Sequence, residues 1–170
     1  MAVDTFVSVE EYLRSSYDPD RDYVDGRLLE RNVGELDHSD LQTEIAVYFR
    51  NRKAELDVHA FVEQRVQISP TRFRIPDVCL VRGPKPTEPI LRTPPFVAIE
   101  ILSKDDRRAD LLLRIDDYLK AGVDSVWVVD PKSRRGWTYD ASGVSEPSDQ
   151  VLRRSDPHIR LPLNHVFAAL

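Results

Sequence analysis

The chain has 170 residues, of which 41% are hydrophobic and 31% are charged, a balance typical of a soluble globular protein and unlike that of a disordered or membrane-spanning chain. We expect a single domain over residues 1–170, because this length can bury a core without disulfides or a structural metal. The 24 basic and 29 acidic residues give a formal charge of −5, so the chain as a whole does not attract nucleic acid, although a local basic face still can.

Membrane spans, export signals and cysteine chemistry are also limited by the sequence. No apolar run reaches the length of a bilayer span. The first residues, MAVDTFVSVEEYL, lack the basic and apolar regions of a secretory signal, so we expect a cytoplasmic protein with no membrane contact. The single cysteine, Cys79, excludes an internal disulfide and a zinc site built on several cysteines.

The chain is predicted to begin with a short helix and a hairpin. Ser8, with Glu11 three positions later, forms a capping box that starts a helix over residues 8–16. Asp25-Gly26 is a strong signal for the two-residue turn of a β-hairpin over residues 22–30.

The next segment is predicted to be a long helix followed by two strands. Apolar residues recur at helical spacing from residue 38 to about residue 56, and either Asp37 or Ser39 could cap this helix. Residues 58–68 then alternate as a half-buried strand does, with Gln64 as the polar exception on its apolar side. A second strand follows over 72–81.

The second half continues with strand, helix and strand. Residues 83–95 are proline-rich and predict an exposed loop, and 95–103 follow as a strand. Residues 106–121 carry apolar side chains on one helical face, including Leu111, Leu112, Ile115 and Leu119, and Gly122 is a natural helix stop.

The fold class predicted from this order is α/β (α+β), a mixed central sheet flanked by helices. Its core order is helix-strand-strand-strand-helix-strand, preceded by the N-terminal hairpin. The remaining predicted elements are a strand at 123–131, further β structure at 135–140 and 150–154, and a short helix within 160–170.

Two acidic residues do not fit an ordinary strand pattern. Period-two alternation places Glu100 on the apolar face of its strand, where an ionised carboxylate is costly unless it is paired or bound to metal. Asp77 follows Pro76 and shares a face with apolar residues of the preceding strand. If these strands are neighbours, about 5 Å apart, the two carboxylates converge on one cation, and hard oxygen ligands favour Mg²⁺ or Mn²⁺.

Structural interpretations of both acids stay open. Asp77 alone is equally typical of a turn or a strand end, and Glu100 alone is typical of a carboxylate paired with a buried arginine. The two together, in consecutive strands and on the apolar face of each, favour a site.

Four motifs, in this order and spacing, resemble the Uma-two family of restriction endonucleases, which belongs to the PD-(D/E)XK superfamily. The motifs are Ile75-Pro76-Asp77-Val78, Ala98-Ile99-Glu100-Ile101-Leu102-Ser103, Arg108-Ala109-Asp110 with Tyr118-Leu-Lys-Ala-Gly-Val123, and Val126-Trp127-Val128-Val129-Asp130-Pro131. The resemblance covers most of the chain, from the helix at Ser8 to the closing Arg160-Leu-Pro-Leu163.

The resemblance implies a restriction-endonuclease-like fold and a Mg²⁺-dependent (or Mn²⁺-dependent) endodeoxyribonuclease that hydrolyses phosphodiester bonds in DNA. Asp77 and Glu100 are the implied metal ligands, with the backbone carbonyl of Ile101 as a further ligand. In such a site the metal polarises the scissile phosphate and lowers the pKa of a bound water. Cutting both strands usually needs two sites, so a homodimer is also expected.

The chain departs from the motif at the lysine. The position two residues after Glu100 is Leu102, and the position from which the family commonly supplies the lysine instead, on the following helix, is Arg114. An arginine can stabilise negative charge on a phosphate but does not accept a proton. Arg114 is therefore predicted to be an electrostatic clamp, with a salt bridge to Asp110 or Asp117 as its structural alternative.

This departure keeps two other functions open. One is a catalytically impaired nuclease-fold module that binds nucleic acid or regulates, and the other is an interaction protein whose acids are only structural. Lys104, just after the strand, could reach the site, although a solvated surface lysine is the ordinary interpretation.

Three further residues are accessory candidates. His38 lies on the apolar face of its helix and points towards the core or the edge of the site. Glu44 borders that face and could add an acid to the metal site, or it could be an exposed helix acid. Gln64 could hydrogen-bond the metal ligands or satisfy buried backbone groups.

Overall fold

The computed structural model describes residues 6–31, 35–154, 159–168 and 170, and its main feature is a six-stranded mixed sheet. The strand order is β10-β9-β8-β7-β6-β3, in which β7 and β8 are parallel and the other neighbours are antiparallel. The strands are β3 (Val58–Val62), β6 (Val78–Arg82), β7 (Val97–Ile101), β8 (Ser125–Asp130), β9 (Arg135–Asp140) and β10 (Gly143–Ser145).

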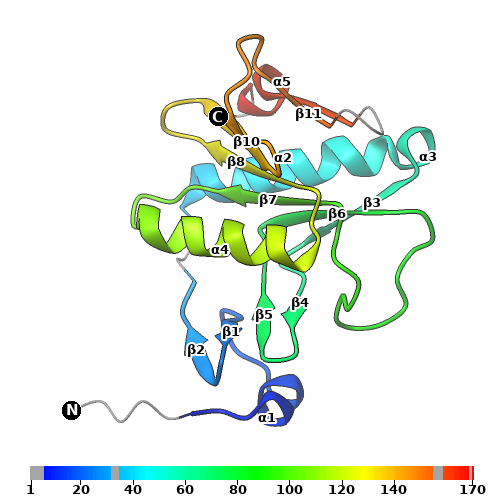
Figure 1. Cartoon of the computed structure of the whole chain (residues 1–170). Helices are drawn as coiled ribbons and strands as arrows, with labels where there is room; N and C mark the ends of the chain where they lie inside the picture. Colours follow the sequence, from blue (N-terminus) through cyan, green and yellow to red (C-terminus); the bar gives the residue numbers. More distant parts are fainter. Residues whose placement is uncertain (1–5, 32–34, 155–158, 169) are drawn as a thin grey trace.

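One helix on each face covers this sheet (Figure 1). Helix α4 (Arg108–Ala121) makes the crossover between the parallel strands β7 and β8 and packs Leu111, Ile115 and Tyr118 on one face. Helix α2 (Leu36–Asn51) lies on the other face, and the four-residue helix α3 (Lys53–Leu56) follows it. The expected mixed sheet flanked by helices is confirmed.

The C-terminal segment completes the core on the α2 side. Strands β11 (Val151–Arg153) and β12 (Arg160–Pro162) form an antiparallel pair, and helix α5 (Leu163–Phe167) follows. Their buried residues join the same hydrophobic cluster as Phe49 and Trp127. No helix among the described residues is both long enough and apolar enough to span a membrane.

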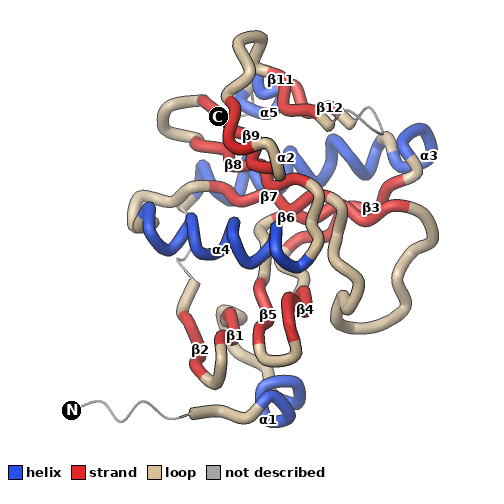
Figure 2. The backbone as a smooth tube through the Cα atoms, in the orientation of Figure 1, coloured by secondary structure: helices blue, strands red, loops and turns tan. Residues whose placement is uncertain are grey.

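A second sheet projects from the central one beside helix α1 (Val9–Arg14) (Figure 2). Its order is β2-β1-β5-β4, formed by β1 (Asp22–Val24), β2 (Arg27–Leu29), β4 (Val66–Ser69) and β5 (Arg72–Arg74). The predicted turn joins β1 to β2, since Asp25 and Gly26 both have positive φ, 49° and 92°, as a type I′ turn requires. The predicted Ser8 cap is also present, because its side chain accepts a hydrogen bond from the Glu11 amide.

Two predicted strands are each divided between the two sheets. The segment 58–68 breaks after β3, where Glu63 has a φ of 48°, and resumes as β4 in the second sheet. The segment 72–81 breaks between β5 and β6 across Ile75-Pro76-Asp77. The alternation of apolar residues is interrupted at each break only by one polar residue, Gln64 or Asp77, and a single polar residue does not reveal that a strand changes sheets.

Two details of the predicted helices are wrong. The long helix begins at Leu36 after the cap residue Glu35, so neither Asp37 nor Ser39 occupies the cap. Leu112 was expected on the buried face of α4 but is 42% exposed. The predicted stop at Gly122 is confirmed, with a φ of 99°.

Candidate active site

A cavity of about 470 Å³ lies between the β1-β2 hairpin, the end of β7 and the beginning of α4. Figure 1 shows β2 and the connection from β7 to α4 on the same side of the molecule. Seven carboxylates and four guanidinium groups line the cavity, together with His38. The excess of carboxylates gives the cavity a net negative charge that favours a bound cation.

The sheet places Asp77 and Glu100 together in this cavity. Val78 pairs with Ile99 in the antiparallel register of β6 and β7, so the residue before Val78 and the residue after Ile99 come opposite each other on the same face. Both residues line the cavity, and each is 4% exposed. The two carboxylates therefore lie on the same face of the sheet and in the same cavity.

Asp77 is held from both sides of its carboxylate. Its Oδ2 accepts a hydrogen bond of 2.7 Å from the backbone N–H of Ile101, a residue of β7 that lies beyond the pairing of β6 with β7. Its Oδ1 accepts a hydrogen bond of 2.8 Å from Nη2 of Arg31. Gln42 on α2 donates to the carbonyl of Asp77 at 2.9 Å, which ties this turn to the helix behind it.

Glu100 is held by two side chains of α4. The hydroxyl of Tyr118 donates to its Oε1 at 2.8 Å, and Nε of Arg114 donates to its Oε2 at 3.1 Å. Arg114 also contacts Oδ1 of Asp106 through Nη2, at 3.3 Å. The side chain of Arg114 thus lies between two carboxylates at the wall of the cavity.

The environment shifts the proton affinity of Glu100 upwards. Burial raises the pKa of Glu100 to about 7, and the negative charge of Asp77 adds to this effect. The positive charges of Arg114 and Arg31 act in the opposite direction. A carboxyl group that exchanges its proton near neutral pH is typical of functional sites.

His38, at the start of α2, lies next to the other carboxylate. Its Nε2 is 3.4 Å from Oδ2 of Asp77. Burial lowers the pKa of His38, but the hydrogen bond and the negative charge of Asp77 outweigh this and raise it above the ordinary value. The expectation that His38 points towards the core or the edge of the site matches this position.

A buried ionic network supports the wall of the cavity. Arg74 on β5 donates through Nε and Nη2 to Oδ2 of Asp117 on α4, at 2.8 and 2.6 Å, and through Nη1 to Asp22 on β1, at 2.9 Å. Each of the three residues is 5% exposed or less. This network joins the second sheet to the helix that carries Arg114 and Tyr118.

The contacts of Arg114 and Glu100 bear on the structural alternatives for these two residues. Arg114 pairs with Glu100 and Asp106 and not with Asp110 or Asp117. Asp117 pairs instead with Arg72 and Arg74. Glu100 does pair with an arginine, as its structural alternative supposed, but Arg114 is half-buried and the pair lies within the cavity.

The remaining candidate residues do not line the cavity that holds Asp77 and Glu100. Gln64 follows the end of β3 and donates to the backbone carbonyls of Arg65 and Pro89, so it satisfies backbone groups. The exposed ammonium of Lys104 pairs with Glu35. Leu102 packs in the hydrophobic cluster beneath α4. Glu44 is half-buried on α2 and does not line the cavity.

The donor set fits a small divalent cation. Mg²⁺ is usually held by one or two carboxylates, with waters and substrate phosphate completing its octahedral shell, and Asp77 and Glu100 supply two such carboxylates in one polar cavity. In the described part of the chain, no three His, Cys, Asp or Glu side chains are gathered as a closed metal cluster. An open site of this kind needs ligands from solvent and substrate.

Sequence reasoning missed Arg31 and Asp106, and it gave Tyr118 no role beyond its place in a family motif. Arg31 follows a hairpin strand and has no periodic pattern around it, so no local signal indicated its role. Asp106 accepts from the amide of Ser103, a turn pattern that was visible in the sequence. Tyr118 lies one helical turn after Arg114, and this spacing could have placed it beside Glu100.

Among solved structures, the chain is similar to one described as "Crystal structure of a putative nuclease belonging to DUF820 from Anabaena variabilis ATCC 29413", with a TM-score of 0.81 and 22% identity. The match covers 96% of this chain and 98% of that chain. At this level of identity the likeness establishes the fold, which is a mixed α+β nuclease fold. No curated protein matches the chain.

The family follows from the sequence itself. Residues 9–162 match the family model described as "Uma2: Putative restriction endonuclease". The chain belongs to this family of restriction-endonuclease-like nucleases, so the resemblance predicted from the four motifs is confirmed. Nucleases of this type bind nucleic acid and generally use divalent metals.

Proposed function

We propose that this protein is a metal-dependent endodeoxyribonuclease that hydrolyses phosphodiester bonds in DNA, with Asp77 and Glu100 as ligands of Mg²⁺ or Mn²⁺. The observation that carries the proposal is the common cavity of the two buried carboxylates, where the amide of Ile101 holds Asp77 beside the strand of Glu100. The carbonyl of Ile101 is the proposed further ligand.

Each residue of the site has a separate task in this proposal. A bound divalent metal supplies Lewis acidity, which polarises the scissile phosphate and makes hydroxide available near neutral pH. The Ile101 amide orients Asp77, and Tyr118 orients Glu100. Arg114 carries a permanent positive charge that can stabilise the charge developing on the phosphate.

Metal binding tests the ligand assignment directly. Calorimetric titration of Mn²⁺ should show binding to the wild type and a large loss of affinity in Asp77→Asn. Asp116→Asn, on the exposed face of α4, is the matched control and should bind as the wild type does. Equal Mn²⁺ binding by Asp77→Asn and the wild type would remove the proposed site.

Cleavage tests the reaction. Supercoiled plasmid incubated with the wild type and Mg²⁺ or Mn²⁺ should be nicked or linearised, and Glu100→Gln should abolish the cutting. Cutting that persists unchanged in Glu100→Gln would contradict the catalytic assignment.

A second function, DNA binding without cleavage, is favoured by one observation. Leu102 is half-buried against the cluster beneath α4. The described residues that line the cavity include arginines but no lysine, and an arginine does not exchange its proton as a lysine can. Under this alternative the wild type binds DNA and does not cut it. Arg114→Lys, which restores the family's lysine, should then produce cutting.

We further propose that the active form is a homodimer, since two sites are needed to cut both strands of a duplex. Sedimentation velocity measures this directly. A monomer that nicks only one strand would contradict the dimer and leave the hydrolytic site intact.

A further inference from the structure

Asp77 and Glu100 share a pattern of contacts. Each has one oxygen on a neutral donor, which is the Ile101 amide for Asp77 and the Tyr118 hydroxyl for Glu100. Each has its other oxygen on a guanidinium group, from Arg31 and Arg114 respectively. One side of each carboxylate is therefore fixed by the fold, and the other is held by a long cationic side chain.

Both arginines also have a second carboxylate within reach. Nη1 of Arg31 is 3.5 Å from Glu63, whose side chain is 56% exposed, and Nη2 of Arg114 is 3.3 Å from Asp106. A cation that binds between Asp77 and Glu100 must compete with these guanidinium groups for the same oxygens. A guanidinium that already contacts another carboxylate can leave the first one without losing all of its charge compensation.

Arg31 is well placed to serve a phosphate after such an exchange. Its side chain is 16% exposed and lines the cavity from the hairpin side, whereas Arg114 lines it from the α4 side. Guanidinium groups bind phosphate oxygens through two donors in a fixed planar geometry. Two arginines entering from different walls can hold one phosphate from two directions.

We propose that Arg31 is an exchangeable counter-cation: it neutralises Asp77 before metal binds, leaves Oδ1 of Asp77 when a divalent cation binds there, and then contacts a substrate phosphate together with Arg114. This inference rests on the proposed metal site and adds a phosphate-binding residue that also sets the affinity for metal. Glu63 favours this exchange, because it gives Arg31 a second carboxylate near the cavity when Arg31 leaves Asp77.

The first experiment compares Mn²⁺ affinities by calorimetry. Arg31→Gln removes the competing charge, so Mn²⁺ should bind about tenfold more tightly than to the wild type, in line with the effect of a neighbouring charge on a carboxylate. The matched control is Arg135→Gln. Arg135 is an exposed arginine on β9 that pairs with Glu146, away from the cavity, so this variant should leave the affinity unchanged.

A second variant predicts a change of opposite sign. Glu63→Gln removes the second carboxylate of Arg31, so Arg31 should hold Asp77 more firmly and Mn²⁺ affinity should fall severalfold. Glu63 is exposed and outside the cavity lining, so this variant should fold even if Arg31→Gln does not. Thermal unfolding monitored by circular dichroism checks both proteins.

The phosphate contact is measured separately, by fluorescence anisotropy of a labelled duplex oligonucleotide with Mn²⁺-loaded protein. The duplex carries phosphorothioate linkages, which resist hydrolysis, and gel analysis checks that it is uncut. Arg31→Gln should weaken binding and reduce the slope of log affinity against log salt by about one, as loss of one phosphate contact does. Unchanged oligonucleotide affinity would overturn the phosphate role.

The two proposals fail in different ways. Mn²⁺ binding by the wild type with unchanged or weaker binding by Arg31→Gln would overturn the exchange and leave the metal site standing. Absence of Mn²⁺ binding in the wild type and in Arg31→Gln alike would overturn the metal site itself. Mn²⁺ binding that is seen only in Arg31→Gln would support the exchange.

Discussion

At Glu100, a proton and a metal ion compete for the same carboxylate. Burial raises the pKa of Glu100 to about 7, with a further contribution from Asp77. Below this pH the metal-free protein holds a proton on Glu100 that an incoming cation must displace. Protonated His38, which faces Asp77, also opposes metal binding, and Asp77 raises the pKa of His38 above its ordinary value. Both effects therefore weaken metal binding as the pH falls.

The affinity of the protein for Mn²⁺ is expected to depend on pH. Affinity should rise with pH through neutrality, because Glu100, with a pKa of about 7, must lose its proton to bind metal. Below about pH 7 the affinity should fall by at least about tenfold for each pH unit, since protonation of Glu100 alone gives that slope. Calorimetry between about pH 5 and about pH 9, in buffers of different ionisation enthalpy, measures both the affinity and the proton released. A profile that is flat across neutral pH would contradict the raised pKa of Glu100.

Tyr118 is predicted to position Glu100 for metal binding. Tyr118→Phe removes the hydroxyl that donates to Oε1 at 2.8 Å. Because that hydrogen bond lowers the pKa of Glu100, its loss should raise this pKa further and weaken Mn²⁺ binding severalfold at neutral pH. The deficit should shrink at higher pH, where Glu100 is ionised in both proteins.

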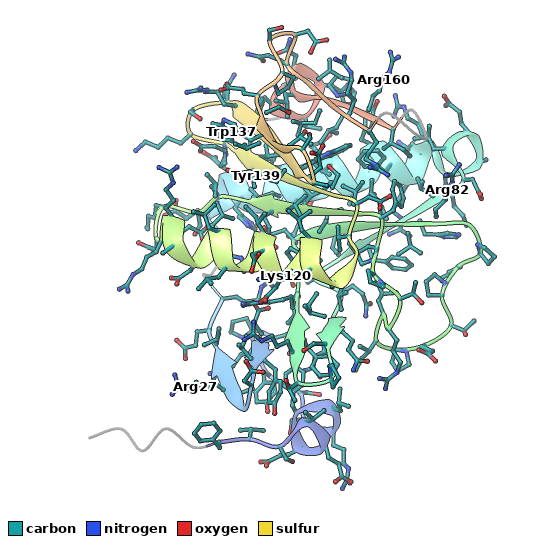
Figure 3. All side chains as sticks on the ribbon, viewed as in Figure 1. Arg27, Arg82, Lys120, Trp137, Tyr139 and Arg160 are labelled. Atoms are coloured by element: carbon teal, nitrogen blue, oxygen red, sulfur yellow. The ribbon has the colours of Figure 1, made fainter. Side chains whose placement is uncertain are left out.

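The controls for Tyr118→Phe separate positioning from stability. The loss of one buried hydrogen bond should lower the free energy of unfolding by about 1 kcal/mol. Tyr139→Phe on β9, labelled in Figure 3, removes a hydroxyl away from the cavity and should leave Mn²⁺ binding unchanged. If the pH dependence of binding is the same in Tyr118→Phe and the wild type, Tyr118 has no positioning role.

At the scale of elements, α4 is fixed to the second sheet by the buried network of Arg74, Asp22 and Asp117. Asp117 accepts hydrogen bonds from both Arg72 and Arg74 of β5. Because these contacts lie within one helical turn of Arg114 and Tyr118, the network helps to set the height of α4 above Glu100. The second sheet therefore bears on the geometry of the site even though the central sheet carries both carboxylates.

The stability of this link is testable with neighbouring residues. Asp117→Asn leaves Arg74 buried with less compensating charge and should lower the free energy of unfolding by about 3 kcal/mol. Asp116→Asn changes the adjacent residue, which is exposed and pairs only across the helix surface with Lys120, and should have little effect. Urea denaturation compares the two, and similar losses in both would contradict the role of the network.

The end of α4 gives a prediction about the backbone alone. Gly122 has a φ of 99°, and a Cβ added there would meet its nearest neighbour, Pro94, only at 4.0 Å. Gly122→Ala should therefore destabilise the protein by about 1 kcal/mol through conformational strain and without a steric clash. Thermal unfolding measures the change, and an unaltered Tm would show that the left-handed conformation is not required.

On the scale of the whole molecule, the C-terminal segment closes the core against α2. Its buried residues, Leu152, Ile159, Leu161, Leu163, Val166 and Phe167, are each at most 3% exposed. Burial of one such side chain contributes about 1.5–3 kcal/mol, so the set is comparable with the total stability of a domain of this size, about 5–15 kcal/mol.

Removal of residues 151–170 should therefore abolish cooperative folding. The truncated chain should show no sigmoidal thermal transition by circular dichroism and should be digested rapidly by protease at temperatures where the full chain resists. A cooperative transition in the truncated chain would show that the central sheet and its helices α2 and α4 are stable without this segment.

The sequence alone determined the features that depend on neighbouring residues. The Asp25-Gly26 turn, the Ser8 cap and the Gly122 stop follow from backbone conformations that only certain residues adopt readily. The alternation around Glu100 placed a carboxylate on an apolar face, and the order of the motifs identified the family. All of these signals lie within a few residues or in the order of segments along the chain.

Only the tertiary structure decided which strands share a sheet and which cations face the carboxylates. The apolar alternation resumes after Gln64 and after Asp77, although each break sends the chain to the other sheet. Arg31 reaches Asp77 across 46 residues of sequence and Arg114 reaches Glu100 across 14. Such long-range pairs depend on how the hairpin and α4 pack around the cavity, which is a property of the folded chain and not of any local pattern.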